Sequence, residues 1–167
     1  MIRFDQAIDI DRPVEEVFAY LADFTNLPTW NYYVHQVRRL TPEPVDVGAV
    51  YEQIRRTDRQ RFQISAYDPP RTVAVTTLPG QRPAFHRTFT VRPTAGDGSR
   101  VHDSWELDTG HPRLVQRVAT ARIKAAVAEN LAVLNQLLEH GHARLQDGRT
   151  VALDTPRPSS HHRRRSP

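Results

Sequence analysis

The chain has 167 residues, of which 38% are hydrophobic and 25% are charged. This length fits one domain of about 140 residues with a tail better than two full domains. The chain contains no cysteine, which excludes disulfides, cysteine-ligated zinc, iron–sulfur clusters and thiol nucleophiles. No apolar stretch approaches the roughly 18–20 residues that span a bilayer, and residues 1–10 lack the order of a signal peptide, so we expect no membrane span and a cytoplasmic protein.

The net charge of +4 is confined to the C-terminal end. Residues 1–140 contain 17 basic and 17 acidic side chains, whereas residues 141–167 contain 6 and 2. We therefore expect a balanced folded domain over 1–140 and a basic tail over 141–167, disordered from about residue 148 onward. The Arg163–Arg165 run either attracts phosphates of RNA, DNA or a membrane, or is a solvated end. Because the tail holds no aromatic residue to stack on a base, no specific nucleic-acid partner is expected.

The first thirty residues predict a strand followed by two short helices. Apolar residues stand mostly two apart in residues 2–10, which is the period of a half-buried strand. Asp11 or Arg12 then caps a helix in which Pro13 takes the first position. A second cap and proline in residues 23–30 predict a short helix directly afterwards.

From residue 33 to residue 108, short β-like runs alternate with turn residues. Because no helical pattern separates these runs, they favour an antiparallel meander over a parallel α/β sheet. The six runs span residues 33–41, 49–57, 61–68, 72–78, 84–92 and 100–108.

A long helix is predicted over residues 112–140, ending at Gly141. Apolar residues recur at steps of three and four, from Val118 in the first half to Leu131 and Leu134 in the second. The elements together predict an α+β fold of seven antiparallel strands, two short helices after the first strand and one long C-terminal helix.

Several motifs occur in an order typical of one superfamily. They are Ile8-Asp9-Ile10-Asp11-Arg12-Pro13-Val14-Glu15-Glu16-Val17-Phe18-Ala19-Tyr20-Leu21-Ala22-Asp23, Leu27-Pro28-Thr29-Trp30-Asn31, Val47-Gly48-Ala49-Val50-Tyr51, Tyr67-Asp68-Pro69-Pro70-Arg71, Asp97-Gly98-Ser99-Arg100-Val101 and Glu129-Asn130-Leu131. Over residues 2–140 the chain thereby resembles the START-like polyketide cyclase/dehydrase and lipid-transport superfamily (SRPBCC). The resemblance implies a helix-grip fold, in which a curved sheet wraps the long helix. It also implies a cavity between them for lipids, polyketides, steroids or other apolar molecules.

Strand alternation places candidate ligand-binding residues on the concave face of that sheet. The runs 84–92 and 100–108 are expected to pair across the turn at residues 94–99. The sequence numbers of two residues that lie opposite each other then add up to about 192 or 194. The candidates from these two runs are Phe85, Arg87, Phe89, Asp103 and Trp105. Two aromatic residues of earlier runs, Tyr51 and Phe62, are added to them. Tyr33 and Gln53 are further polar candidates whose face the pattern leaves open.

Arg87 and Asp103 are the catalytic candidates because charged groups on an apolar wall need a partner or a ligand. In the functional interpretation Arg87 holds a ligand carbonyl, enolate or carboxylate, and Asp103 orients Arg87 or acts as a base. In the structural interpretation the two form an ion pair near the sheet rim, or Arg87 makes a cation–π contact with Trp105. His35, His86 and His102 each stand alone in their local sequence, and the pair His161-His162 lies in the tail, so no metal site is expected. No cofactor motif is present.

Three functions are compatible with these residues. The leading hypothesis is binding of a small, mainly hydrophobic ligand by a monomer or homodimer, with affinity arising mainly from apolar burial. The second is a polyketide cyclase, aromatase or dehydratase that acts in the cavity through confinement and acid–base contacts. The third is a protein- or RNA-interaction module, since some superfamily members resemble quinone-binding chaperones or ribosome-binding toxins.

Overall fold

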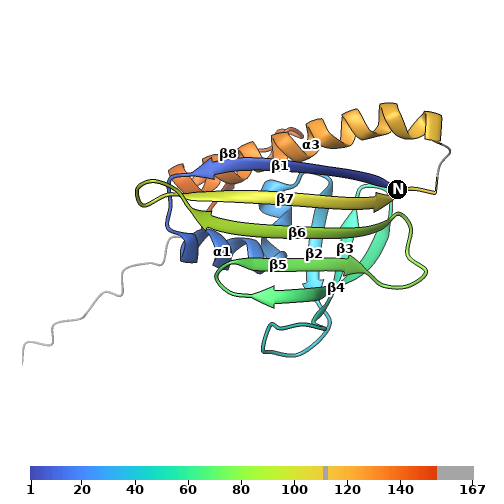
Figure 1. The fold of residues 1–167 in the computed structure, drawn as a ribbon, viewed down its shortest axis with the longest axis horizontal. Coiled ribbons are helices and arrows are strands. Elements are labelled where there is room, and N and C mark those ends of the chain that lie inside the picture. Colours follow the sequence, from blue (N-terminus) through green and yellow to red (C-terminus); the bar gives the residue numbers. More distant parts are fainter. Residues whose placement is uncertain (111–112, 154–167) are drawn as a thin grey trace, which may run out of the picture.

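A strongly curved antiparallel sheet forms one layer of the fold, and the helices lie on its concave side (Figure 1). The computed structural model describes residues 1–110 and 113–153. The elements are β1 (Ile2–Ile10), α1 (Val14–Ala22), the 3-10 turn η1 (Phe24–Asn26), α2 (Leu27–Trp30), β2 (Val34–Arg39), β3 (Val50–Arg55), β4 (Arg59–Asp68), β5 (Thr72–Thr77), β6 (Ala84–Pro93), β7 (Ser99–Asp108), α3 (Arg113–His140), β8 (His142–Arg144) and β9 (Thr150–Ala152). Among the described residues, no helix is long and apolar enough to cross a membrane.

The seven-stranded sheet has the order β1-β7-β6-β5-β4-β3-β2, with every neighbouring pair antiparallel. Strands β2 to β7 are connected as a meander, and β1 closes the far edge beside β7. Each of the six expected runs contains most of one strand. The predicted α+β helix-grip fold is therefore confirmed.

The pairing of β6 with β7 follows one of the two expected registers. Phe89 lies opposite Asp103 and Arg87 lies opposite Trp105, so facing positions sum to 192. Odd-numbered residues of both strands point to the concave side, where Val91 and Val101 are buried. The even-numbered residues form the convex face.

The first short helix, α1, begins one residue later than expected. Pro13 has φ −59° and ψ 150°, so its backbone is extended and it precedes the first turn of α1. Glu15 and Glu16 occupy that turn, where the positive end of the helix dipole favours acidic side chains. The one-residue shift lies within the usual uncertainty of helix ends.

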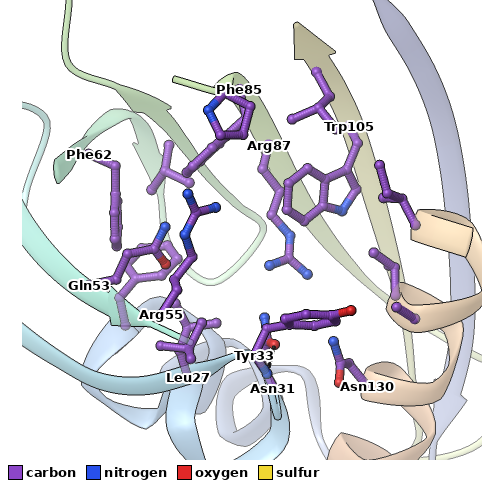
Figure 2. Close-up of a pocket in the computed structure, with 18 of the residues that line it drawn as sticks. Leu27, Asn31, Tyr33, Gln53, Arg55, Phe62, Phe85, Arg87, Trp105 and Asn130 are labelled. Atoms are coloured by element: carbon purple, nitrogen blue, oxygen red, sulfur yellow. Dashed lines mark hydrogen bonds between the residues drawn. The ribbon is translucent and has the colours of Figure 1, made fainter. Parts of the chain in front are cut away.

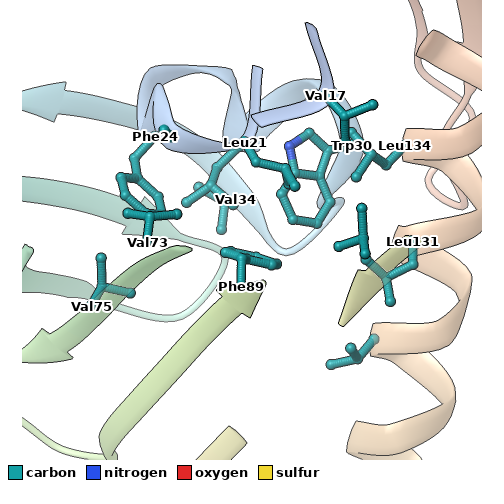
Figure 3. Close-up of a cluster of buried hydrophobic side chains, with 14 of the residues drawn as sticks. Val17, Leu21, Phe24, Trp30, Val34, Val73, Val75, Phe89, Leu131 and Leu134 are labelled. Carbon is teal, nitrogen blue, oxygen red and sulfur yellow. The ribbon is translucent and has the colours of Figure 1, made fainter. Parts of the chain in front are cut away.

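The hydrophobic core lies between the short helices, the middle of the sheet and the C-terminal half of α3 (Figure 3). Trp30 of α2 is buried and makes an edge contact with Phe89, with ring centroids 6.1 Å apart. Leu131 and Leu134 of α3 are buried on the other side of this cluster. The packed core joins the sheet to the C-terminal half of α3. Space therefore remains between the sheet and the earlier part of α3.

Helix α3 is longer than the surface that it covers. It has 28 residues, a length of about 42 Å. Its second half is packed, but Val118 is 63% exposed, contrary to the expected apolar stripe through that position. A hydrogen bond joins α3 to β1 at Lys124, whose carbonyl accepts from Gln6 Nε2, and Val118 lies more than a turn before this contact.

The described chain continues past residue 140 in a small hairpin of β8 and β9. Gly141 has φ 78°, the left-handed conformation that ends a helix, and its carbonyl accepts a hydrogen bond from the amide of Leu153 at 2.8 Å. Ala143 and Leu145 are buried. Ordered structure thus extends beyond the expected domain end and includes part of the segment expected to be disordered, whereas Arg163–Arg165 lie outside the described residues.

Candidate functional site

A cavity of about 300 Å³ lies between the concave face of the sheet and α3, at the end of the molecule that the core leaves unfilled (Figure 2). Its wall is mostly apolar. The apolar lining residues are Phe24, Leu27, Val34, Phe62, Val75, Pro83, Phe85, Trp105, Leu107, Ile123, Ala126 and Val127. The polar ones are Asn31, Tyr33, Gln53, Arg55, Arg87, Thr109, Arg122 and Asn130.

Four of the expected ligand-binding residues line this cavity: Phe62, Phe85, Arg87 and Trp105. The rings of Phe62 and Phe85 are 6.2 Å apart, and those of Phe85 and Trp105 are 5.7 Å apart. The three rings therefore form a continuous aromatic wall across β4, β6 and β7.

The other three expected residues, Tyr51, Phe89 and Asp103, are buried beneath that wall and do not line the cavity. Tyr51 stacks on Phe62 with the ring planes 10° apart. Burial raises the pKa of the Tyr51 phenol, so the group stays neutral at neutral pH. These residues share the concave face with the lining residues, but Tyr51 and Phe89 are covered by the short helices and Asp103 by its ion pair.

Arg87 and Asp103 form a buried bidentate ion pair. Arg87 Nε lies 2.8 Å from Asp103 Oδ1, and Nη2 lies 2.6 Å from Oδ2. Arg87 is 5% exposed and Asp103 is 0% exposed, so the pair belongs to the interior and not to the rim of the sheet. Because both carboxylate oxygens accept hydrogen bonds from Arg87, Asp103 holds this guanidinium in one orientation.

Aromatic rings enclose the Arg87 guanidinium. Its carbon Cζ lies 4.2 Å from the centre of the Phe89 ring, 4.3 Å from that of Trp105 and 5.4 Å from that of Trp30. The ion pair and the cation–π contact that the structural interpretation anticipated are both present. Even so, the guanidinium points into the cavity toward the ring of Tyr33 (Figure 2), and its nitrogen Nη1 has no hydrogen-bond partner among the described residues.

Helix α3 contributes one face to the cavity. Arg122, Ile123, Ala126, Val127 and Asn130 recur at steps of three and four, so they lie on one side of the helix. Asn130 is buried and points inward (Figure 2). Arg122 and Asn130 were not expected at this site from the sequence. A polar residue within the apolar stripe of a helix is the signal that would have identified Asn130.

Two further polar groups of the wall are fixed by neighbours. Arg55 forms a bidentate ion pair with Asp58, with two contacts of 2.6 Å. Gln53 Nε2 donates to Gln60 Oε1 at 3.0 Å, and Gln60 in turn donates to the Pro83 carbonyl. Both contacts hold these side chains in place at the β3 side of the cavity.

Two buried polar atoms of lining residues have no hydrogen-bond partner within the described residues: Trp105 Nε1 and Thr109 Oγ1. A buried donor without an acceptor costs about 1–3 kcal/mol, so such atoms mark places where a ligand or water completes the structure. Among the described residues, no group of three or more His, Cys, Asp or Glu side chains is placed to hold a metal ion.

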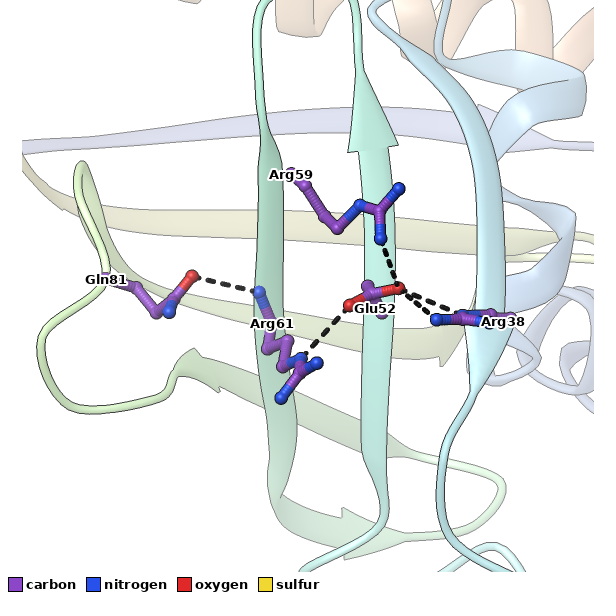
Figure 4. Close-up of polar contacts among 5 residues, drawn as sticks. All are labelled: Arg38, Glu52, Arg59, Arg61 and Gln81. Atoms are coloured by element: carbon purple, nitrogen blue, oxygen red, sulfur yellow. Dashed lines mark hydrogen bonds and ion pairs between the residues drawn. The ribbon is translucent and has the colours of Figure 1, made fainter.

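A separate polar cluster lies on the convex face, outside the cavity (Figure 4). The Glu52 side chain is 1% exposed, with Arg38 at 2.7 Å, Arg61 at 3.1 Å and Arg59 at 3.7 Å. The hydrogen bonds from Arg38 and Arg61 hold the pKa of Glu52 below its usual value. The cluster ties β2, β3 and β4 together at the curved end of the sheet.

The sequence profile of a family described as polyketide cyclase / dehydrase and lipid transport matches residues 1–139. Among curated proteins, none matches the chain significantly. Three solved structures with the same fold share only 15–19% sequence identity with this chain.

Two of these structures match this chain over nearly the whole of their own length. A Deinococcus radiodurans protein is 19% identical with a TM-score of 0.61, and the match covers 84% of this chain and 99% of that one. A Thermus thermophilus protein is 15% identical with a TM-score of 0.68, and the match covers 82% and 97% of the two chains.

The third is the di-domain ARO/CYC protein StfQ of the steffimycin biosynthetic pathway, which is 16% identical with a TM-score of 0.62. That match covers 81% of this chain but 44% of StfQ. At these identities the three structures establish similarity of fold.

Proposed function

We propose that this chain, which belongs to the polyketide cyclase / dehydrase and lipid transport family, binds a small, mainly hydrophobic molecule in the cavity between its sheet and α3. The observation that carries the proposal is the mostly apolar wall of that cavity, which extends from the aromatic residues of the sheet to Val127 of α3. Transfer of apolar surface from water to such a wall contributes about 25 cal/mol per Å².

The size and shape of the cavity favour a compact aromatic ligand. A volume of about 300 Å³ is at the lower end of the range of small-molecule sites, which suits one small ring system better than a long acyl chain. The rings of Phe62, Phe85 and Trp105 offer faces and edges against which such a ring packs favourably.

A second candidate function is catalysis of cyclisation, aromatisation or dehydration in the same cavity. It is favoured by the position of Arg87, which lines the cavity and whose nitrogen Nη1 forms no hydrogen bond within the described part of the chain. There a guanidinium would stabilise the negative charge of an enolate. StfQ, an ARO/CYC protein, has the same fold, which supports this second candidate.

Within this second function Asp103 is a positioning residue. It does not line the cavity, and both of its oxygens bind Arg87, so it is poorly placed to accept a proton from a ligand. The chemistry would therefore depend on confinement and on Arg87, with Asp103 fixing the guanidinium.

Native mass spectrometry of the protein purified from its own host tests the binding function. The expected result is an additional mass from a bound apolar compound. An empty protein that also fails to bind a panel of lipids and aromatic polyketides would contradict binding and would favour the interaction-module hypothesis. The choice between monomer and homodimer and the cytoplasmic location stay predictions.

The bound compound then serves to test catalysis. If the chain is an enzyme, incubation with a precursor of that compound changes the precursor's mass, and Arg87→Leu abolishes the change while the protein stays folded. Turnover that persists in Arg87→Leu would remove Arg87 from the mechanism.

A further inference from the structure

The charged side chains that line the cavity all have the same sign. Over the part of the chain that the structure describes, they are Arg55, Arg87 and Arg122, and no aspartate or glutamate is among the lining residues. A wall of one sign within a mostly apolar cavity raises the affinity for ligands of the opposite charge.

Two of these three charges are already neutralised. Arg55 is paired with Asp58 and Arg87 with Asp103, in each case through two hydrogen bonds to the carboxylate. Arg122 differs, because its guanidinium forms neither an ion pair nor a hydrogen bond within residues 1–110 and 113–153. The cavity wall together with its internal partners therefore carries one uncompensated positive charge, at Arg122.

An unpartnered hydrogen-bond donor lies at the same level of the cavity. The carbonyl of Lys124 accepts from Gln6 Nε2 at 3.4 Å, and Gln6 lies opposite Asp103 in the pairing of β1 with β7. Arg122 is therefore on the turn of α3 beside the part of β1 that pairs with this part of β7, and both Arg122 and Trp105 line the cavity. The indole nitrogen of Trp105 is on the side of the ring nearer α3 (Figure 2), and this buried N–H has no acceptor in the part of the chain that the structure describes.

We propose that the ligand is an organic acid: an apolar ring system in the cavity, with a carboxylate or another anionic oxygen seated between Trp105 Nε1 and Arg122. The inference rests on the proposed binding function and specifies its ligand class. The indole N–H supplies a hydrogen bond to the anionic oxygen, and Arg122 supplies the opposite charge. The seat discriminates against amines, because Arg122 would repel a cation and the indole N–H would be left without an acceptor.

The test compares 2-naphthoate with 2-naphthamide, which has the same ring and nearly the same shape but no charge at pH 7. Binding to the full chain is measured by isothermal titration calorimetry. We expect 2-naphthoate to bind about tenfold more tightly, a difference of about 1.4 kcal/mol.

Three variants locate the origin of that preference. Arg122→Gln removes the charge at an exposed position, and Trp105→Phe keeps an aromatic ring but removes the N–H. Each is expected to reduce the preference for 2-naphthoate to about threefold or less. Arg92→Gln is the matched control, because Arg92 is exposed on the convex side of β6 and its replacement leaves the preference unchanged.

Each outcome decides between the two proposals. A preference for 2-naphthoate that falls in Arg122→Gln and Trp105→Phe supports the acid-binding seat. Equal binding of both probes, a preference that survives both substitutions, or failure of 2-naphthoate to bind a protein that binds neutral aromatic compounds would overturn the seat and leave the binding function standing. Failure to bind any apolar compound would remove both.

Discussion

Arg87 and Asp103 are diagonal neighbours across β6 and β7, since Phe89 and not Arg87 lies directly opposite Asp103. The long arginine side chain spans that offset and reaches both carboxylate oxygens. In doing so it crosses the face of the Phe89 ring. The pair thus fixes a cation at the floor of the cavity, where the cost of burying either charge alone is offset by the other.

Removal of one member of this pair destabilises the protein strongly. Asp103→Asn keeps the volume but leaves the Arg87 charge buried without its counter-charge, and we expect the free energy of unfolding to fall by about 3–5 kcal/mol. Urea denaturation followed by circular dichroism measures the change.

The double variant Arg87→Met/Asp103→Val provides the control, because it removes both charges and retains apolar packing. It should be more stable than Asp103→Asn. A double variant that loses as much stability as the sum of two independent substitutions would show that the two residues do not act as a pair.

The sequence predicted the strands and their pairing because these depend on local signals. Turn residues separate the strands, and alternation of side chains places Arg87 and Asp103 on the same face. The length of the turn between β6 and β7 left two registers open, and the structure has the one in which facing positions sum to 192. What local patterns do not contain is which part of the concave face becomes cavity and which part becomes core.

That division depends on where the helices lie. Trp30 of α2 covers Phe89, so Phe89 belongs to the core. Phe85, four residues earlier on the same face of β6, lines the cavity. The contribution of α3 could not be predicted from local patterns either. Arg122 and Asn130 line the same cavity as the aromatic wall only because the helix packs against the sheet. The three-residue strands β8 and β9 are too short to give a periodic pattern.

Glu52 is expected to make stability depend on pH. Its pKa is lowered in the folded protein by Arg38 and Arg61, so its contribution is present above the unfolded pKa of roughly 4.3 and is lost as the pH falls through the folded value. Glu52→Gln should therefore lower the melting temperature at pH 7, and the difference from wild type should shrink as the pH falls below about 4.

Thermal unfolding between pH 3 and pH 7 measures this effect. Asp5→Asn, at an exposed acid on β1, is the matched control and should change the melting temperature little at any pH. A melting-temperature difference for Glu52→Gln that is the same at pH 3 and pH 7 would contradict the proposed ionic role.

The hairpin of β8 and β9 is expected to belong to the folding unit. A chain ending at residue 140 lacks the buried side chains of Ala143 and Leu145, and burial of one leucine contributes about 1.5–3 kcal/mol. We therefore expect it to be less stable than a chain ending at residue 153 by about 2 kcal/mol or more.

Urea denaturation of the two truncated chains gives the difference, and Leu145→Ala in the full chain should reproduce much of it. Equal stability of the two truncated chains would instead place the end of the domain at residue 140, as composition alone suggests.

The most direct test of the account is to fill the cavity. Ala126 lines it, whereas Ala125, the preceding residue of α3, faces solvent. The variants Ala126→Phe and Ala125→Phe therefore add the same ring inside and outside the cavity. Binding of the neutral probe 2-acetylnaphthalene is measured by isothermal titration calorimetry. The account predicts that wild type and Ala125→Phe bind equally and that Ala126→Phe binds at least about tenfold more weakly, a loss of about 1.4 kcal/mol. Undiminished binding by a folded Ala126→Phe would contradict the assignment of this cavity as the ligand site.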